Sequence, residues 1–359
     1  MMVLVRLTET TGVYTWLAIR AGQVSRGRPL AVVASLAVTT AVLSAFLDNL
    51  TTVLLMVPIT FLLADALDID PLPLVIIEVI TSNIGGTATL IGDPPNIIIA
   101  GATGLSFGAF IGNLAPVAAV AFVATTGMLY LFYRGRLQVE DKDRERVMAL
   151  DADRSIEDRE ELNRTVPVLA LTIVVFFFHK QLHIEPATVA LAGATAMLLI
   201  SRQSLEEALA GIEWATLFFF IGLFVMVGAL EESGAIGEVA QAIGDVTAGD
   251  RTAELLGIAW VSALGSAVVD NIPFTTTMIP VVEELRGESG DDAYWWVLSI
   301  GACFGGNATI IAAAANVAAA GMAARSGRPI GFMEFLRVGI PVTLVSMVIA
   351  TAYIGLRYL

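Results

Sequence analysis

The sequence repeats itself at a nearly constant spacing. The segment SAFLDNLTTVLLMVPI, which begins at Ser44, recurs as SAVVDNIPFTTTMIPV, which begins at Ser266. The segment GGTATLIGDPPN (85–96) recurs as GGNATIIAAAAN (305–316), at almost the same separation along the chain. Both pairs of motifs interrupt strongly apolar runs. A duplication of this kind predicts two structural repeats, an arrangement that is common in secondary transporters.

The composition places these repeats in a membrane. Hydrophobic residues make up 56% of the chain, charged residues make up 15%, and the mean hydropathy is +0.78, whereas soluble domains carry about 25% charged residues. The net charge of −14 argues against a nucleic-acid-binding protein, which would show a basic face. Because Cys303 is the single cysteine, no intrachain disulfide or thiolate metal cluster can form. We expect no cofactor.

Apolar stretches of about the length that a membrane-spanning helix needs recur along the whole chain. They cover residues 29–46, 50–64, 72–101, 107–133, 165–180, 185–200, 214–231, 252–269, 272–285, 293–324 and 332–356. Residues 134–164 separate them into two groups and are dense in charges of both signs. We predict a helical, solvated linker there. The predicted fold class is an all-α polytopic membrane protein.

Two pairs of apolar segments are joined by too few residues for an aqueous loop. Only residues 47–49 separate the first pair, so we predict a re-entrant hairpin over 29–64 with Asp48-Asn49 at its buried tip. The same reasoning predicts a hairpin over 252–285 with Asp270-Asn271 at its tip. The alternative is two ordinary pairs of spanning helices, which would leave both aspartates in very short loops.

The number of predicted membrane crossings between equivalent points of the two repeats is odd. The second repeat is therefore expected to be inverted relative to the first, as in transporters with inverted-topology repeats. This assignment puts most Lys and Arg residues on the side of the 134–164 linker and leaves Lys180, Arg251, Arg286 and Arg357 on the other. The positive-inside rule then predicts a multi-pass plasma-membrane protein with a cytoplasmic linker and an outside C-terminus.

The apolar run 72–101 contains residues that do not suit a continuous helix. Pro94-Pro95 cannot continue a helix but fits the first turn of a new one, and Asp93 stands ahead of them as an N-cap. We therefore predict a half-helix over 72–81, an unwound segment over 82–92 and a second half-helix over 94–101. The ends of half-helices expose peptide N–H and C=O groups to a ligand at mid-membrane. The alternative is a glycine hinge or packing kink without a ligand.

Polar side chains near these breaks and tips are the candidate site. Acidic groups at membrane depth are functional candidates by default, so we predict proton coupling at Asp48 and Asp270, with helix capping as the alternative. A Na⁺ ion is also conceivable near Asn49, Asn83, Asn271 and Asn307. The predicted substrate- or ion-binding residues are Asp48, Asn49, Thr51, Thr52, Ser82, Asn83, Gly85, Gly86, Thr87, Thr89, Asp93, Asn96, Asp270, Asn271, Thr275, Gly305, Gly306, Asn307, Thr309 and Asn316. Glu78, one turn before the predicted break, also qualifies.

At these motifs the sequence resembles the ArsB/NhaD permeases of the ion transporter superfamily, whose sequence domain is called citrate-transporter-like. That group includes arsenite efflux pumps, NhaD-type sodium/proton antiporters and the P protein. The resemblance implies a scaffold domain and a transport domain built from hairpins and broken helices, and it is compatible with a homodimer. Carried over by position, the first-repeat site is Asp48-Asn49 with 82–93, and the second-repeat site is Asp270-Asn271 with 304–312.

Two departures from the resembled family shape the predicted domain organisation. Full members of the family have additional scaffold helices at the N-terminus. Only MMVLVRLTE corresponds to them here, so we expect an N-terminally truncated first repeat over 1–133. The linker 134–164 and an inverted second repeat over 165–359 follow. The GDPPN motif becomes AAAAN in the second repeat, so Asp93 has Ala313 as its partner position. The two sites are therefore expected to differ.

The acidic tips bear on the substrate. Carboxylates at both tips would repel an anion and suit a proton, a sodium ion or a neutral solute. We therefore favour proton-coupled efflux of arsenite or antimonite, held as a neutral acid, with a soluble ATPase as a partner of such pumps. A Na⁺/H⁺ antiporter is the first alternative, and a sodium- or proton-coupled carboxylate transporter is the second. A passive channel is a further alternative. An intramembrane aspartyl protease is a remote one, because Leu90 breaks the GxGD signature of such enzymes. We expect no enzymatic activity.

Overall fold

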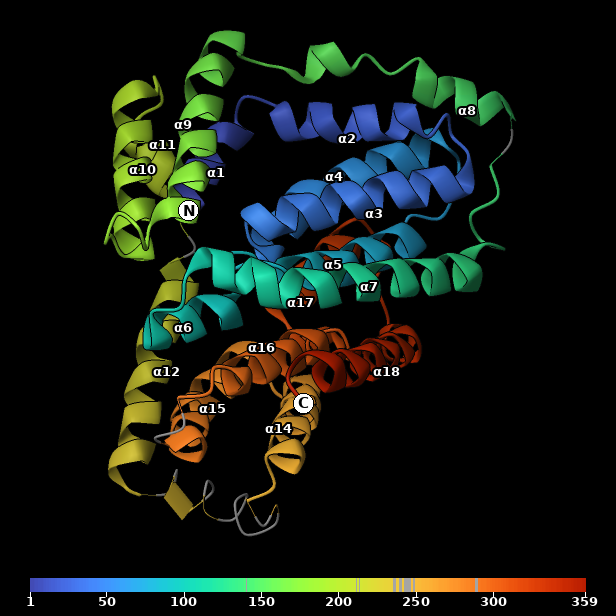
Figure 1. Cartoon of the computed structure of the whole chain (residues 1–359). Coiled ribbons are helices and arrows are strands. Elements are labelled where there is room, and N and C mark those ends of the chain that lie inside the picture. Colours follow the sequence, from blue (N-terminus) through green and yellow to red (C-terminus); the bar gives the residue numbers. More distant parts are fainter. Residues whose placement is uncertain are drawn as a thin grey trace.

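The computed structural model describes residues 1–139, 141–210, 212, 214–234, 237–238, 241, 247, 249–287 and 290–359, and within them all regular structure is helical (Figure 1). Residue 140 of the predicted linker and residues 211 and 213 of the predicted scaffold lie outside the described residues. In a bilayer, every backbone polar group must find its partner within the protein, which helices achieve without neighbours.

The first half of the chain contains α1 (Met2–Glu9), α2 (Val13–Val24), α3 (Pro29–Phe46), α4 (Asn49–Ala66), α5 (Leu72–Thr87), α6 (Pro94–Thr103) and α7 (Phe107–Tyr133). The middle contains α8 (Asp141–Met148), the 3₁₀ turn η1 (Ala152–Ser155), α9 (Arg159–Phe178), α10 (Pro186–Ile200), α11 (Leu205–Ala210) and α12 (Trp214–Glu232). The last part contains α14 (Arg251–Val268), α15 (Asn271–Arg286), α16 (Ala293–Gly305), η3 (Ile310–Ala312), α17 (Ala314–Arg325) and α18 (Phe332–Arg357).

Five of the described helices, α3, α4, α7, α9 and α18, are long and apolar enough to cross a membrane. Shorter apolar helices accompany them, among them α5 and α16. The outer surface is apolar as well: Phe218 and Val225 on α12 are 68% and 69% exposed. An apolar surface of this kind suits contact with lipid rather than water. The prediction of an all-α polytopic membrane protein is confirmed.

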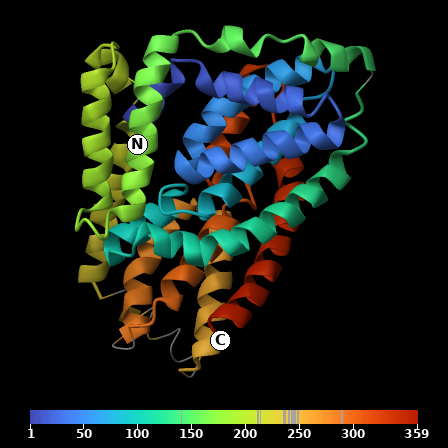
Figure 2. The ribbon, with the colours of Figure 1, turned by 45° about the horizontal axis from the view of Figure 1, so that its top comes forward.

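The helices form two groups (Figures 1 and 2). Helices α1, α9, α10 and α11 share a small core of their own, made by Leu4, Leu7, Met197 and Ala208. The larger core contains α3 to α7 and α14 to α18. Within it, α4 packs on α17, and α15 packs on α6. The second helix of each hairpin thus contacts the broken helix of the other half, and the two halves interlock.

The same close contact recurs in both halves. A Cβ atom added to Gly85 of α5 would lie 2.4 Å from the carbonyl oxygen of Ala41 on α3. A Cβ added to Gly305 of α16 would lie 2.4 Å from the carbonyl oxygen of Ala263 on α14. These positions correspond when the two repeats are aligned by their motifs. Glycine at each of them lets two helices approach backbone to backbone.

The first interruption lies later in the chain than predicted. Helix α5 continues to Thr87, so the prediction of an unwound segment over 82–92 is wrong, and the break covers residues 88–93. In the second half the break lies between the end of α16 at Gly305 and the start of α17 at Ala314, inside the predicted broken helix 293–324. Gly85 and Gly86 serve close packing within α5 and not unwinding, which is why the prediction placed the first break too early. Helix α6 begins at Pro94, as the double proline indicates.

The charged linker is less solvated than predicted, because part of it packs on α2. Ala152 of η1 is buried, and Leu150 accepts a hydrogen bond from Gln23 at 2.7 Å. The indole N–H of Trp16 donates to Asp153 at 3.0 Å. This hydrogen bond, together with the nearby Arg20 guanidinium, holds the pKa of Asp153 below its ordinary value. Sequence reasoning missed α2 itself, because a helix of 12 residues with mixed polarity is too short to be predicted as a span.

Candidate functional site

Each hairpin turns at an aspartate that caps the following helix. Asp48 accepts hydrogen bonds from the backbone N–H and the hydroxyl of Thr51, both at 2.7 Å. Asp270 accepts one from the backbone N–H of Ile272 at 2.9 Å. These bonds satisfy free N–H groups at the starts of α4 and α15. Both carboxylates are half-buried rather than buried as predicted. At Asp48, φ is +150° and ψ is 160°, a conformation that costs about 1–3 kcal/mol in residues other than glycine.

The asparagines that follow these aspartates converge on one carboxylate. The side-chain amide of Asn49 donates to Oδ1 of Asp93 at 3.1 Å, and the amide of Asn271 donates to the same oxygen at 3.3 Å. Asp93 is fully buried, and its Oδ2 has no hydrogen-bond partner among the described residues. Asp93 occupies the N-cap position of α6, but its side chain caps nothing there. The predicted capping role is wrong, because the carboxylate accepts from the amides of Asn49 and Asn271 and from no N–H group at the start of α6.

A second set of amides joins the two halves. Asn49 also donates to Oδ1 of Asn83 at 3.1 Å. Asn83 in turn donates to the side-chain oxygens of Asn307 at 3.1 Å and Asn316 at 2.9 Å. All four side chains are buried. The amide nitrogen of Asn307 has no partner within the described part of the chain. Among the described residues of the centre, Oδ2 of Asp93 is therefore an unpartnered acceptor, and the amide nitrogen of Asn307 is an unpartnered donor.

The two asparagines that end the repeated motifs hold the breaks in place. Asn96 donates to the carbonyl oxygens of Thr87 at 3.1 Å and Thr89 at 2.7 Å. Asn316 donates to the carbonyl oxygens of Gly306 and Thr309, both at 2.7 Å. These carbonyls belong to the unwound ends of α5 and α16, where no helix continues to satisfy them. The amide nitrogens of both asparagines are thus used by the backbone.

Threonine and serine hydroxyls tie the breaks to the hairpins. Thr89 donates to the carbonyl of Ala45, and Thr309 donates to the equivalent carbonyl of Ala267 at 2.9 Å. Ser82 donates to the carbonyl of Asn49 at 3.0 Å. The two threonine anchors correspond between the repeats. They fix each hairpin against the broken helix of its own half.

The remaining predicted site residues are threonines and glycines in or beside this centre. The hydroxyls of Thr87 and Thr275 donate to carbonyls of their own helices, at 2.8 Å and 2.7 Å. Thr51 belongs to the cap of Asp48, and the hydroxyl of Thr52 is buried without a partner among the described residues. The glycines have no side chains to offer and serve close approach. They are Gly85 and Gly305 at the helix contacts, Gly86 against Gly92, and Gly306 against the amide of Asn271.

The charges that the described residues bring to the centre are negative. Asp48 and Asp270 lie close enough to Asp93 for the three carboxylates to interact electrostatically. Within the part of the chain that the structure describes, no Lys, Arg or His side chain hydrogen-bonds to the network. The described residues also contain no cluster of three His, Cys, Asp or Glu side chains that could hold a metal ion. The centre thus favours neutral or positively charged occupants.

Sequence reasoning missed one neighbour of the centre. Ser299 of α16 donates to Oδ1 of Asn96 at 2.5 Å, and the thiol of Cys303 lies 3.9 Å from the same oxygen. Cys303 is buried. A lone serine within the apolar segment 293–305 was the available signal, but single serines are common in membrane helices and carry little information.

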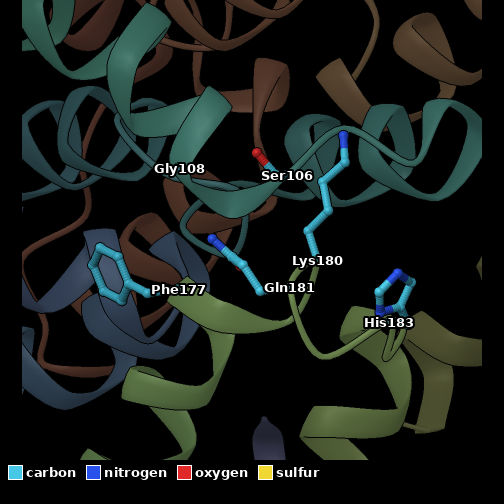
Figure 3. Close-up of a pocket in the computed structure, with 6 residues that line it drawn as sticks. All are labelled: Ser106, Gly108, Phe177, Lys180, Gln181 and His183. Carbon is cyan, nitrogen blue, oxygen red and sulfur yellow. The ribbon is translucent and has the colours of Figure 1, made fainter.

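A separate hollow of about 440 Å³ lies at the surface (Figure 3). Ser106 and Gly108 line it from the start of α7, and Phe177, Lys180, Gln181 and His183 line it from the end of α9 and the following loop. It contains none of the predicted site residues. The interior network, and not this hollow, is therefore the candidate site.

Comparison with known proteins bears on what such a centre does. Residues 1–301 match the family model described as "Citrate transporter". The chain belongs to the citrate transporter family. It is a membrane transporter of that family, and the resemblance to the ArsB/NhaD permeases is confirmed.

Individual proteins of known sequence are similar to this transporter over nearly its whole length. It is 44% identical to "Uncharacterized transporter Rv2684" of Mycobacterium tuberculosis over 100% of this chain and 84% of that protein. It is 40% identical to the "46 kDa membrane protein" of Mycobacterium leprae, over 100% of this chain and 85% of that protein. The P protein of Sus scrofa is 34% identical over 99% of this chain and 52% of the P protein.

Proposed function

We propose that this transporter is a proton-coupled exporter of a small neutral hydroxylated solute of the arsenous or antimonous acid type. The observation that carries the proposal is the pair of unpartnered groups at the centre among the described residues, Oδ2 of Asp93 and the amide nitrogen of Asn307. A hydroxyl group is both a donor and an acceptor, so a solute with several hydroxyls can satisfy both groups. An unsatisfied buried polar group costs about 1–3 kcal/mol, which such a solute would recover.

The negative charge of the centre supports a neutral solute over an anion. Asp48, Asp93 and Asp270 interact electrostatically, and no basic side chain of the described residues is bonded to the network. A di- or tricarboxylate entering as a free anion would meet repulsion from all three. The family description names citrate, but the polar groups here are not those that recognise a carboxylate, which are most often Arg or Lys. Carboxylates therefore rank third.

A Na⁺/H⁺ antiporter is the second candidate. An unpartnered carboxylate oxygen is a ligand that hard cations such as Na⁺ prefer. Oδ2 of Asp93 offers one such ligand, whereas Asn49 and Asn271 direct their amide nitrogens to Oδ1 of the same carboxylate. In this version Na⁺ and protons compete for Asp93. Both candidate functions use the carboxylate of Asp93; they differ in whether it binds Na⁺ or the hydroxylated solute.

Proton coupling follows from the same acids in both candidates. A proton on one of the three carboxylates relieves the repulsion between them, so protonation and solute binding are linked at the centre. We propose that the half-buried Asp48 and Asp270 exchange protons with the two sides and that Asp93 binds the occupant. The interlocked helices α3 to α6 and α14 to α17 would form the transport domain, and α9, α10 and α12 the scaffold domain.

We propose the plasma membrane as the location, with the linker 134–164 in the cytoplasm and the C-terminus outside. A homodimer joined through the scaffold domain, and a soluble ATPase that energises export, complete the arrangement that the resemblance implies. The lipid bilayer itself contacts the exposed apolar faces of α10 and α12.

Purified protein in liposomes tests the proposal. Export or uptake of arsenite, Na⁺ and citrate is measured separately under an imposed pH gradient. We expect gradient-driven arsenite transport by the wild-type protein and its loss in Asp93→Asn. The matched control is Asp65→Asn, since Asp65 lies at the end of α4 with its side chain 66% exposed. Gradient-driven transport of Na⁺ alone would support the second candidate, and arsenite transport unchanged in Asp93→Asn would refute the proposal.

A further inference from the structure

A second acid is buried inside the first half, away from the tips. Glu78 of α5 is fully buried. Its Oε1 accepts a hydrogen bond from the hydroxyl of Thr60 on α4, and its Oε2 has no hydrogen-bond partner among the described residues. A carboxylate with one bare oxygen in apolar surroundings is costly to keep ionised, whereas the neutral acid is tolerated. The geometry therefore favours a carboxyl group that holds a proton.

Among the described residues, no positive charge is placed to hold Glu78 as an anion. The helices packed against α5 include α3, α4, α7, α16 and α17. Helices α3 and α7 carry no Asp, Glu, Lys, Arg or His within their bounds. The other charged or titratable groups on these helices are the exposed Asp65 and Arg325 at helix ends, and Tyr130, Tyr133, Tyr294 and Cys303. None of them is bonded to Glu78 in the described contacts.

The fold does not require a polar pair at this place. When the repeats are aligned by their glycine pairs, Glu78 corresponds to Leu298. When they are aligned by their hairpin motifs, Thr60 corresponds to Val282. Leu298 and Val282 are both fully buried, and their helices α16 and α15 pack on each other as α5 and α4 do. An apolar pair thus fills the equivalent position without loss of the fold, and the Thr60–Glu78 pair is specific to the first half.

Glu78 lies one helical turn of α5 before a residue that contacts the centre. Ser82 follows it by one helical turn on the same face of α5, which makes the two side chains neighbours. Ser82 donates to the carbonyl of Asn49 at 3.0 Å, and Asn49 donates to Asp93. Glu78 therefore lies one helical turn from a serine that contacts the asparagine bonded to the central carboxylate. The second half has Ala302 in place of Ser82.

We propose that Glu78 is a second proton-binding site, which exchanges protons between the central carboxylate and the side on which the first hairpin opens. In the step, the O–H bond of the Glu78 acid breaks and an O–H bond forms on the carboxylate of Asp93 or on water. No electrons are exchanged. The inference rests on the proposed proton-coupled transport and adds a path for the proton that serves one side of the membrane only.

Two variants separate a proton-binding role from a packing role. Glu78→Gln keeps the shape and an acceptor for Thr60 but cannot release a proton. The double variant Glu78→Leu with Thr60→Val copies the apolar pair of the second half, which this fold accommodates. The first measurement is pH-difference infrared spectroscopy of the protein in lipid, without any solute. We expect a protonated carboxyl band in the wild type that is lost in both variants.

The second measurement is transport in liposomes in two modes. We expect both variants to lose transport driven by a pH gradient and to retain solute exchange at equal pH, which needs no net proton movement. A carboxyl band or gradient-driven transport that is unchanged in both variants would overturn the inference. If the wild-type protein shows no gradient-driven transport of any solute while the band is lost in both variants, the proposed function fails and the proton-binding site stands.

Discussion

Replacing Gly85 by alanine should force α3 and α5 apart. The added Cβ would lie 2.4 Å from the carbonyl oxygen of Ala41 and 2.5 Å from its Cα, whereas ordinary contacts begin at 3.4 Å. The helices must therefore move apart until the contact is relieved, and both contact atoms belong to rigid backbone. Overpacking of this kind costs about 1–3 kcal/mol. The separation would also stretch the 2.7 Å hydrogen bond from Ser44 to the carbonyl of Ser82.

The matched control is Gly127→Ala. Gly127 lies inside α7, and an added Cβ would meet nothing within 4 Å, so alanine should gain about 1 kcal/mol of helix propensity there. The two variants should differ by about 2–4 kcal/mol in free energy of unfolding, measured by denaturant titration of the purified protein in detergent micelles. Equal stability of Gly85→Ala and Gly127→Ala would refute the close contact of α3 with α5.

Further predictions address the breaks, the tips and the linker. Asn96→Ala leaves the carbonyls at the end of α5 without their donors and should destabilise the protein by about 2–4 kcal/mol, and a wild-type unfolding transition would count against this bracing role. Asp48→Asn and Asp270→Asn should each abolish proton-coupled transport while the protein stays inserted, because asparagine still caps a helix; transport at the wild-type rate in both would exclude the coupling role. The pKa of Asp153 is lowered in the folded protein, so its contribution to docking of the linker is present above the ordinary Asp pKa of about 4 and is lost only as the pH falls through the lowered value. Limited proteolysis of the linker should accordingly be slow in the wild type down to about pH 4 and faster at neutral pH in Asp153→Asn; equal cleavage of the two proteins would contradict a role of the Asp153 charge in docking the linker.

The repeats and most helices were predictable because their signals are local. The apolar run 29–46 coincides with α3, and Pro94 begins α6 because proline suits the first helical turn. The position of the break was not predictable from Gly85 and Gly86. Glycine permits unwinding and also permits close packing, and only the neighbouring backbone at Ala41 decides between the two.

The candidate site could be predicted by residue type but not by arrangement. The sequence indicates that Asn49 and Asn271 are equivalent, and it shows that Asp93 has Ala313 in the corresponding position. It therefore predicts two unequal sites. In the structure both asparagines donate to the single carboxylate of Asp93, so one acid serves both hairpins. This convergence depends on how the halves interlock, which no local pattern encodes.

The distance between the two hairpin tips tests the central claim most directly. Because Asn49 and Asn271 bond to the same oxygen of Asp93 at 3.1 Å and 3.3 Å, their amide nitrogens cannot lie farther apart than the two distances together. In a Cys303→Ala background, Asn49→Cys with Asn271→Cys should be joined by a short bifunctional thiol cross-linker in native membranes. The control, Asn49→Cys with Leu264→Cys, should not, because Leu264 is 65% exposed on the outer face of α14. A bridge in the first pair alone is the predicted result, and its absence, or equal bridging in both pairs, would contradict a shared centre.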